Sequence, residues 1–216
     1  PLCTGHELTG LIRDGAGRVT GAEVKGPKGL RRVTTRRGVV LAAGGYPHDS
    51  ARRAASFDHV RRGLPHYSMS PTSGTGGAIA AAEAIGAGFV DTNANGGFWT
   101  PVSLLPNPDG SVRPFPHLIL DRAKPGVIAV GHDGRRFVNE ASSYHDFVQG
   151  LIAKLLAEGQ RSAWLIADHR AIRRYGLGAV HAFPAPMGRH LASGYLKRGA
   201  TPDDLARQCG IAPDAL

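Results

Sequence analysis

The sequence predicts a mixed fold in two parts, an α/β part over residues 1–94 and an α+β part over residues 95–216. The first 46 residues alternate apolar stretches with glycine turns, and a glycine loop later opens a helix of small residues at 73–87. Residues 91–118 are rich in Asn, Gly and Pro, and short strands and helices alternate behind them. We therefore place a domain crossing at about residue 95.

The N-terminal part begins as a β-meander. Three expected strands, at residues 8–13, 19–24 and 30–35, are separated by the turns Asp14-Gly15-Ala16-Gly17 and Gly26-Pro27-Lys28-Gly29. This arrangement places three neighbouring strands in one sheet.

The run Gly38-Val39-Val40-Leu41-Ala42-Ala43-Gly44-Gly45 predicts a fully buried, parallel strand. Two alanines and two glycines at its end remove side-chain bulk over four positions, which favours the close approach of a ligand. The alternative is a strand that ends in an ordinary glycine turn.

An Arg-rich stretch follows, with helix potential at residues 50–57. Ser73-Gly74-Thr75-Gly76 then opens the small-residue helix, whose first amides can face a phosphate group. The glycines do not form G-x-G-x-x-G and no strand leads directly into them, so this loop is weak evidence by itself.

The centre of the chain is the polar corner at residues 131–147. Residues 126–130 predict a buried strand, His132-Asp133-Gly134 a turn, and residues 135–138 the returning strand. The helix that follows has candidate N-caps in Asn139, Ser142 and Ser143, and its apolar positions Phe147, Leu151, Leu155 and Leu156 recur at helical spacing.

Four polar side chains meet at this corner: Arg136, Asn139, Glu140 and Tyr144. Arg136 and Glu140 either serve a ligand or form a structural ion pair that ties the hairpin to the helix. A phenol in the first turn of a helix can face a cavity, which makes Tyr144 a candidate acid or base if neighbouring groups lower its pKa.

The rest of the C-terminal part predicts a short strand at residues 163–167, a helix at 169–175 and a long Gly/Pro-rich loop at 176–190. Thr201-Pro202-Asp203-Asp204 has the pattern of a helix N-terminus, and that helix should run through Gln208.

Composition limits the function classes. With 216 residues and 42% hydrophobic content the chain can bury a core, and we expect a soluble, cytoplasmic protein without a signal peptide or membrane span. Cys3 and Cys209 have no companion ligands, so we expect neither a disulfide framework nor a metal site. The net charge of +9 comes from scattered arginine pairs without a recognition motif, which favours a basic surface over nucleic-acid binding.

Several of these segments resemble one flavoprotein family. Gly38–Gly45 with Pro47-His48-Asp49, then Ser73–Gly76, then Pro125–Val130 with Asp-Gly-Arg-Arg-Phe-Val-Asn-Glu at residues 133–140, are similar to fumarate reductases, succinate dehydrogenase flavoprotein subunits and 3-ketosteroid dehydrogenases. The resemblance covers essentially the whole chain in order, and residues 133–140 are its most specific part.

This resemblance implies FAD as the cofactor. Residues 1–94 would be part of a Rossmann-like FAD domain and residues 95–216 a capping domain that binds substrate. The implied cofactor contacts are Ala43, Gly44, Gly45, Ser73, Gly74, Thr75 and Gly76. The family's dinucleotide fingerprint would precede residue 1 and further catalytic residues, including groups that polarise the ketone, would follow residue 216, so we expect this chain alone to be inactive and its FAD site incomplete.

The resemblance also bears on the substrate. Trp99-Thr100-Pro101 and Leu120-Asp121-Arg122 stand where fumarate reductases carry dicarboxylate-binding residues, and the histidine and threonine of that set are missing. The spacing of Asn139, Glu140 and Tyr144 is similar to the ketosteroid dehydrogenase branch. The implied substrate contacts are Phe98, Trp99, Leu120, Arg136, Asn139 and Glu140.

The mechanism implied is proton removal next to a carbonyl by Tyr144 and hydride transfer from the adjacent carbon to FAD, on a small apolar ketone or enone. The electron acceptor stays open. Two alternatives remain: a dicarboxylate enzyme of the fumarate reductase or succinate dehydrogenase type, and a non-catalytic binding module with the shape of the cap.

Overall fold

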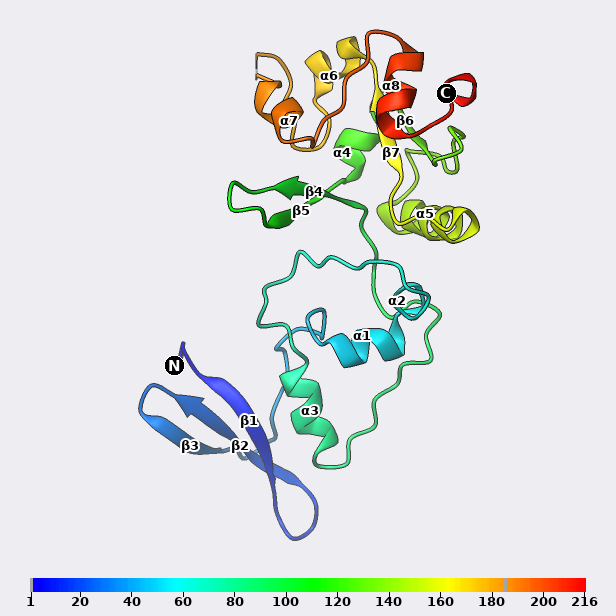
Figure 1. Ribbon diagram of the computed structural model, residues 1–216. Helices are drawn as coiled ribbons and strands as arrows, with labels where there is room; N and C mark the ends of the chain where they lie inside the picture. The colour runs from blue at the N-terminus through cyan, green and yellow to red at the C-terminus, as the bar shows by residue number, and fades with distance from the viewer. Residues whose placement is uncertain (1, 185) are drawn as a thin grey trace. The chain divides into compact units, whose positions relative to one another are not determined.

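The computed structural model describes residues 2–184 and 186–216, leaving aside the side chain of Ile119. The chain divides into two compact units, which are treated separately below (Figure 1). The N-terminal unit consists of Pro1–Arg61 and Ser70–Gly96, and the C-terminal unit of Arg62–Met69 and Gly97–Leu216.

The sheet of the N-terminal unit is the expected meander. Its antiparallel strands β1 (Glu7–Arg13), β2 (Val19–Gly26) and β3 (Gly29–Thr34) lie in sequence order. Asp14 closes the first turn, because its carboxylate accepts the N–H groups of Ala16 and Arg18. The three predicted strands are confirmed.

Three short helices complete this unit: α1 (Ser50–Ser56), α2 (Asp58–Arg61) and α3 (Gly77–Glu83). Asp49 caps α1 by accepting the N–H of Arg52 at 3.0 Å. The Arg52 guanidinium pairs with Glu83, which ties α1 to α3, and α3 packs against β1.

The prediction of a buried, parallel strand at residues 38–45 is wrong. The segment is extended but pairs with no strand in the described part of the chain, and Val40 is 91% exposed. The strand pairs among the described residues are antiparallel. An apolar run becomes a strand only where another backbone satisfies its N–H and C=O groups, and none of the described strands does so here. The Rossmann-like arrangement therefore stays a prediction.

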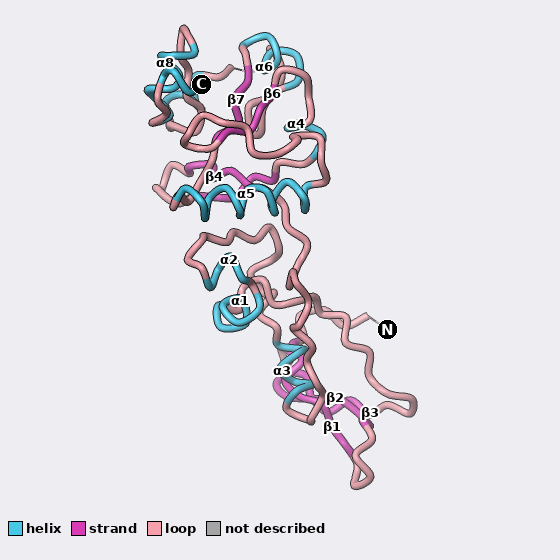
Figure 2. The backbone as a smooth tube through the Cα atoms, turned by 90° about the vertical axis from the view of Figure 1, so that its right-hand side faces the viewer, coloured by secondary structure: helices cyan, strands magenta, loops and turns pink. Residues whose placement is uncertain are grey.

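The C-terminal unit contains two antiparallel pairs. The hairpin of β4 (Val102–Pro106) and β5 (Val112–Pro116) turns at residues 107–111. Strands β6 (Val127–Val130) and β7 (Trp164–Ala167) form the second pair and lie side by side in Figure 2. The helices are α4 (Ile119–Arg122), α5 (Tyr144–Glu158), α6 (His169–Tyr175), α7 (Gly188–Ala192) and α8 (Pro202–Cys209), followed by a 3-10 turn at Pro213–Ala215.

The prediction of a returning strand at residues 135–138 is also wrong. Only Arg136 bridges to Val130, and the strand partner of β6 is β7. The Glu140 carboxylate accepts the N–H of Ala129 at 2.8 Å. The N–H of Ala129 is thus bonded to the Glu140 side chain and cannot bond to residues 135–138. Pairing between these residues and β6 therefore stops after one bridge.

Strand β6 lies at the centre of this unit's core. Val127 packs with Ile172, Leu177 and Val180, while Val130 packs with a second cluster of Ala206, Cys209 and Ile211. The capping predictions are confirmed here, because Thr201 Oγ1 accepts the N–H of Asp204 at the start of α8 and Ser143 caps α5.

Candidate functional site

The turn at residues 131–134 is anchored to the last turn of α5. The Glu158 carboxylate accepts the backbone N–H groups of His132 and Asp133, each at 3.1 Å. Lys154 donates to Asp133 at 2.6 Å, and this hydrogen bond lowers the pKa of Asp133 to about 2. The last turns of α5 are therefore fixed to the turn at residues 131–134.

Glu140 is buried and fully engaged. One carboxylate oxygen accepts from Ala129 N and from Arg136 Nε at 3.0 Å, and the other accepts from Arg136 Nη2 at 2.5 Å. Burial acts to raise the pKa of Glu140, but the hydrogen bonds from Arg136 and Ala129 outweigh it and hold that pKa below its ordinary value. The two residues form the structural ion pair that the sequence allowed as an alternative.

Arg122 is the most buried charged side chain of this region, with 0% of its surface exposed. Its guanidinium donates to the carbonyl oxygens of Glu140 and, at 2.6 Å, of Ser142, and lies 4.7 Å from the centre of the Phe147 ring. Burial lowers the pKa of Arg122, and the carboxylates of Asp121 and Glu140 oppose this. Arg122 thus holds the backbone immediately before α5.

Tyr144 is the first residue of α5. Ser143 Oγ accepts the N–H of Asp146 at 3.1 Å, so the helix starts where Arg122 fixes the chain. Among the described residues, the Tyr144 hydroxyl has no hydrogen-bond partner. The ring meets Phe98 edge to face, with 5.1 Å between centroids and 82° between planes. This phenol is therefore positioned by its helix and by one aromatic neighbour, and its oxygen is available to a ligand.

His145 joins the same cluster, although the sequence did not mark it as a site residue. Its ring stacks on Phe98 with 4.7 Å between centroids and an angle of 23°. Its Nδ1 accepts the backbone N–H of Trp99 at 3.1 Å. Trp99 is buried, whereas Phe98 is 68% exposed and offers an open apolar ring. We call Phe98, Trp99, Tyr144 and His145 the aromatic cluster.

Four predicted substrate contacts lie outside this cluster, and two of them, Arg136 and Glu140, form the ion pair described above. The Asn139 side chain accepts the N–H of Ala141 at 3.0 Å and so shapes the loop before α5. Leu120 lies on α4 and is 72% exposed. The structure thus brings together Phe98, Trp99 and Tyr144, while their roles toward substrate, and those of Leu120, Arg136, Asn139 and Glu140, stay predictions.

A second polar network connects the β4–β5 hairpin to the rest of the unit. His117 bonds to Asp121 Oδ2 and to Ser103 Oγ, each at 2.7 Å, and Ser103 Oγ also bonds to the Tyr195 hydroxyl at 2.7 Å. Ser–His–Asp is the order used in nucleophilic catalysis. Here Ser103 Oγ is shared between the buried His117 and the half-buried Tyr195, so the network joins elements of the fold.

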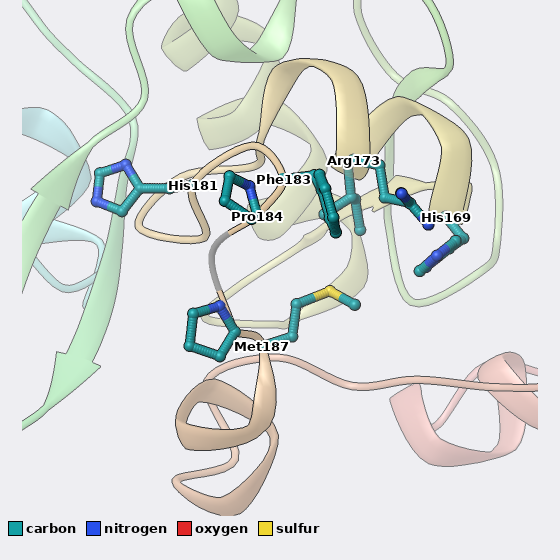
Figure 3. Close-up of a pocket in the computed structure, with 8 residues that line it drawn as sticks. His169, Arg173, His181, Phe183, Pro184 and Met187 are labelled. Carbon is teal, nitrogen blue, oxygen red and sulfur yellow. The ribbon is translucent and has the colours of Figure 1, made fainter.

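A shallow pocket of about 310 Å³ lies between α6 and the loop after it (Figure 3). Arg173 places its guanidinium 4.3 Å from the centre of the Phe183 ring, and both residues line the pocket with His169, His181, Pro184 and Met187. None of the residues predicted to contact cofactor or substrate lines it.

In the N-terminal unit, the predicted FAD segment at 73–76 packs against residues 46–48, which directly follow the other predicted segment at 43–45. The N–H of His48 donates to Gly74 O at 2.9 Å, and a Cβ at Gly74 would meet Pro47 Cγ at 3.0 Å. Gly76 has a φ of +74° and packs closely on Tyr46. A side chain at 76 would be strained by the positive φ, and one at 74 would press on Pro47, so glycine at both positions favours this close packing.

These segments also leave backbone groups open to a ligand. Ala43, Gly44 and Gly45 are exposed, and their amides make no hydrogen bond in the described part of the chain. Ser73 and Thr75, which flank Gly74 in the sequence, are exposed as well. Open amides without side-chain bulk suit a flat cofactor with polar edges, so the residues present fit FAD.

In the described residues, no cluster of three or more His, Cys, Asp or Glu side chains is arranged to bind a metal ion. No described helix combines the length and the apolar character needed to cross a bilayer.

Comparison with known proteins gives a family match and several relatives. Residues 1–215 match the family model described as "FAD binding domain". The chain is 40% identical over 204 residues to 4-oxocyclohex-2-ene-1-carboxylate 5-dehydrogenase of Sinomonas cyclohexanicum, which covers 93% of this chain and 34% of that protein. It is 29% identical over 190 residues to 3-oxosteroid 1-dehydrogenase of Mycobacterium tuberculosis, covering 85% of this chain and 32% of that protein.

Two solved structures share the fold. The 3-ketosteroid delta1-dehydrogenase from Sterolibacterium denitrificans, in complex with 1,4-androstadiene-3,17-dione, aligns with a TM-score of 0.74 and 29% identity over 97% of this chain and 37% of its own. The open form of a flavocytochrome c3 fumarate reductase aligns with a TM-score of 0.55 and 22% identity, over 97% of this chain and 33% of its own. The chain spans about a third of the length of the curated relatives it matches.

Proposed function

The chain belongs to the FAD binding domain family, and from that premise we propose that it forms part of an FAD-dependent dehydrogenase that introduces a carbon–carbon double bond next to the carbonyl of a cyclic ketone. In this proposal the N-terminal unit contributes to the FAD site and the C-terminal unit contains the substrate cap. The observation that carries it is the Tyr144 hydroxyl, held at the start of α5 without a hydrogen-bond partner among the described residues.

Tyr144 acts as the base in this proposal. As the phenolate, it accepts the proton from the carbon next to the carbonyl and becomes the neutral phenol, and the electron pair of that C–H bond forms the new double bond. When bound, FAD would supply the two-electron acceptor for the hydride of the adjacent carbon, which balances the oxidation of the substrate.

The surroundings of Tyr144 favour an apolar ring as substrate. Phe98 meets the phenol edge to face and is 68% exposed, so its uncovered surface can pack on a flat ring. The relatives support this class, since two of the curated ones are named as dehydrogenases of an oxocyclohexene carboxylate and of a 3-oxosteroid.

Two arginines that contact the segment before α5 are already engaged in the fold. Arg122 donates to two backbone carbonyls, and Arg136 pairs with Glu140. Neither guanidinium is therefore available to hold a dicarboxylate without breaking a contact of the fold. This supports a ketone over a succinate-like substrate.

The test uses the protein expressed from its complete reading frame and loaded with FAD. Under anaerobic conditions its flavin absorbance is followed on addition of 4-oxocyclohex-2-ene-1-carboxylate, a 3-oxosteroid or succinate. The proposal predicts bleaching by at least one of the two cyclic ketones and none by succinate. A protein that holds no flavin, or that is bleached by succinate alone, would refute it.

A further inference from the structure

The hydrogen bond between Trp99 and His145 fixes the state of the imidazole. A backbone N–H can only donate, so Nδ1 of His145 must be the unprotonated nitrogen that accepts it at 3.1 Å. In the neutral ring the proton then resides on Nε2. The fold therefore presents His145 as a neutral ring whose outer nitrogen is a donor.

That donor has no assigned partner. Among the described residues, His145 makes the Trp99 hydrogen bond and the stacking contact with Phe98, and no other. Its side chain is half-buried, so Nε2 is not enclosed by the core. The N–H is thus held in direction by two contacts while its own hydrogen-bonding capacity is unused.

The donor and the phenol of Tyr144 share one aromatic neighbour. His145 stacks on Phe98, and Tyr144 meets the same ring edge to face. Both residues belong to the first turn of α5, which Ser143 caps and Arg122 anchors. A substrate ring that packs on Phe98 would therefore lie near both the phenol of Tyr144 and the imidazole of His145.

We propose that His145 donates a hydrogen bond from Nε2 to the ketone oxygen of the substrate, an inference that rests on the function proposed above. Proton removal by Tyr144 places negative charge on that oxygen, and a fixed donor stabilises it. A neutral donor suits this step, because the imidazole binds the developing oxyanion without giving up its proton. His145 would thereby orient the carbonyl group, and its Nε2–H would be a hydrogen-bond donor, supplied by this chain, to the ketone.

Two substitutions separate this role from a structural one. Asparagine at position 145 keeps an acceptor near Nδ1 for the Trp99 N–H but has no donor at the Nε2 position. Glutamine reaches the Nε2 position with an amide N–H but loses the acceptor toward Trp99. His6→Asn is the matched control, because His6 is exposed in the N-terminal unit and its Nδ1 bonds to Thr4 O.

The experiment measures the FAD-loaded complete protein in two ways. The first is the infrared carbonyl stretch of bound 4-oxocyclohex-2-ene-1-carboxylate, assigned with an ¹⁸O-labelled ketone. The second is the stopped-flow rate of flavin reduction by a ketone that bleaches the wild type. The proposal predicts that H145N loses the downshift of the carbonyl band and slows flavin reduction by about 10- to 100-fold. It also predicts that H145Q retains part of both, and that H6N changes neither.

The outcomes distinguish this inference from the proposed function. If H145N keeps the wild-type band and rate while Tyr144→Phe stops flavin reduction, the role of His145 is refuted and the dehydrogenase assignment stands. If H145Q is slowed while H145N keeps the wild-type rate and carbonyl band, the residue acts through its hydrogen bond to Trp99, which also refutes the proposal. If no cyclic ketone reduces the flavin of the wild type, both fall together.

Discussion

Replacing Arg122 by methionine should loosen the start of α5. Methionine fills much of the same volume but leaves the carbonyl oxygens of Glu140 and Ser142 without their donor. Two hydrogen bonds to a charged donor contribute about 1.5–3 kcal/mol each. Removing the buried charge returns part of this, because its desolvation no longer opposes folding, so we expect a net loss of about 2–4 kcal/mol in local stability.

Hydrogen exchange measures this loss where it occurs. In the complete protein, the amides of residues 139–147 should exchange roughly 30- to 700-fold faster in Arg122→Met, since about 1.4 kcal/mol corresponds to a factor of ten. Flavin reduction by a cyclic ketone should slow in parallel, because Tyr144 follows this segment directly. Both effects come from the same two lost contacts.

Arg173→Met is the matched control for this substitution. Arg173 is exposed and stacks on Phe183, so its replacement should leave exchange at residues 139–147 unchanged. Wild-type exchange in Arg122→Met would refute the view that this buried guanidinium holds the loop before α5.

Two further substitutions test the surrounding packing in the complete protein. Glu140→Gln should cost about 1–3 kcal/mol by removing the ion pair with Arg136. The pKa of Glu140 is lowered in the fold, so its contribution is complete above the ordinary pKa of 4.5 and is lost as the pH falls through the lower folded value. Urea unfolding between pH 3 and 6 should therefore show a weaker pH dependence in the variant, and an equal dependence would contradict the assignment. Gly178→Ala should lower stability by about 2–4 kcal/mol, because its φ is +58° and a Cβ would lie 2.6 Å from the Tyr195 hydroxyl. Gly194→Ala shares the positive φ but meets no atom within 4 Å, so thermal unfolding should show a loss of about 1–2 kcal/mol; equal losses in the two variants would refute the steric argument.

The features that the sequence predicted correctly are local ones. Asp14 closes a turn, and Thr201 and Ser143 cap helices, through side-chain contacts within four residues along the chain. Such contacts depend on residue type and spacing, which the sequence contains.

The two strand predictions were wrong because strand pairing depends on residues that lie far apart in the sequence. Residues 38–45 have the composition of a buried strand, but no strand in the described part of the chain pairs with them. Residues 135–138 lose their place beside β6 to Glu140, whose carboxylate takes the Ala129 N–H. Both outcomes depend on which groups meet in space, and composition does not contain that information.

The site was predicted in part for the same reason. The family resemblance singled out Tyr144 and the Phe98-Trp99 pair, and the structure places them together. His145 was missed as a site residue because its role depends on the Trp99 amide, 46 positions earlier in the chain. A histidine directly after the tyrosine of a helix start is the one sequence signal that pointed to it.

The most direct test of the account is the rate of flavin reduction in Tyr144→Phe. The complete FAD-loaded protein is mixed anaerobically with a cyclic ketone that bleaches the wild type, and Tyr175→Phe on α6 serves as the control phenol. Loss of a general base should slow the variant by about 100- to 10,000-fold, with ligand affinity and flavin content retained and the control unchanged. A Tyr144→Phe rate within a few-fold of the wild type, a factor that would be too small for a base, would contradict the central claim.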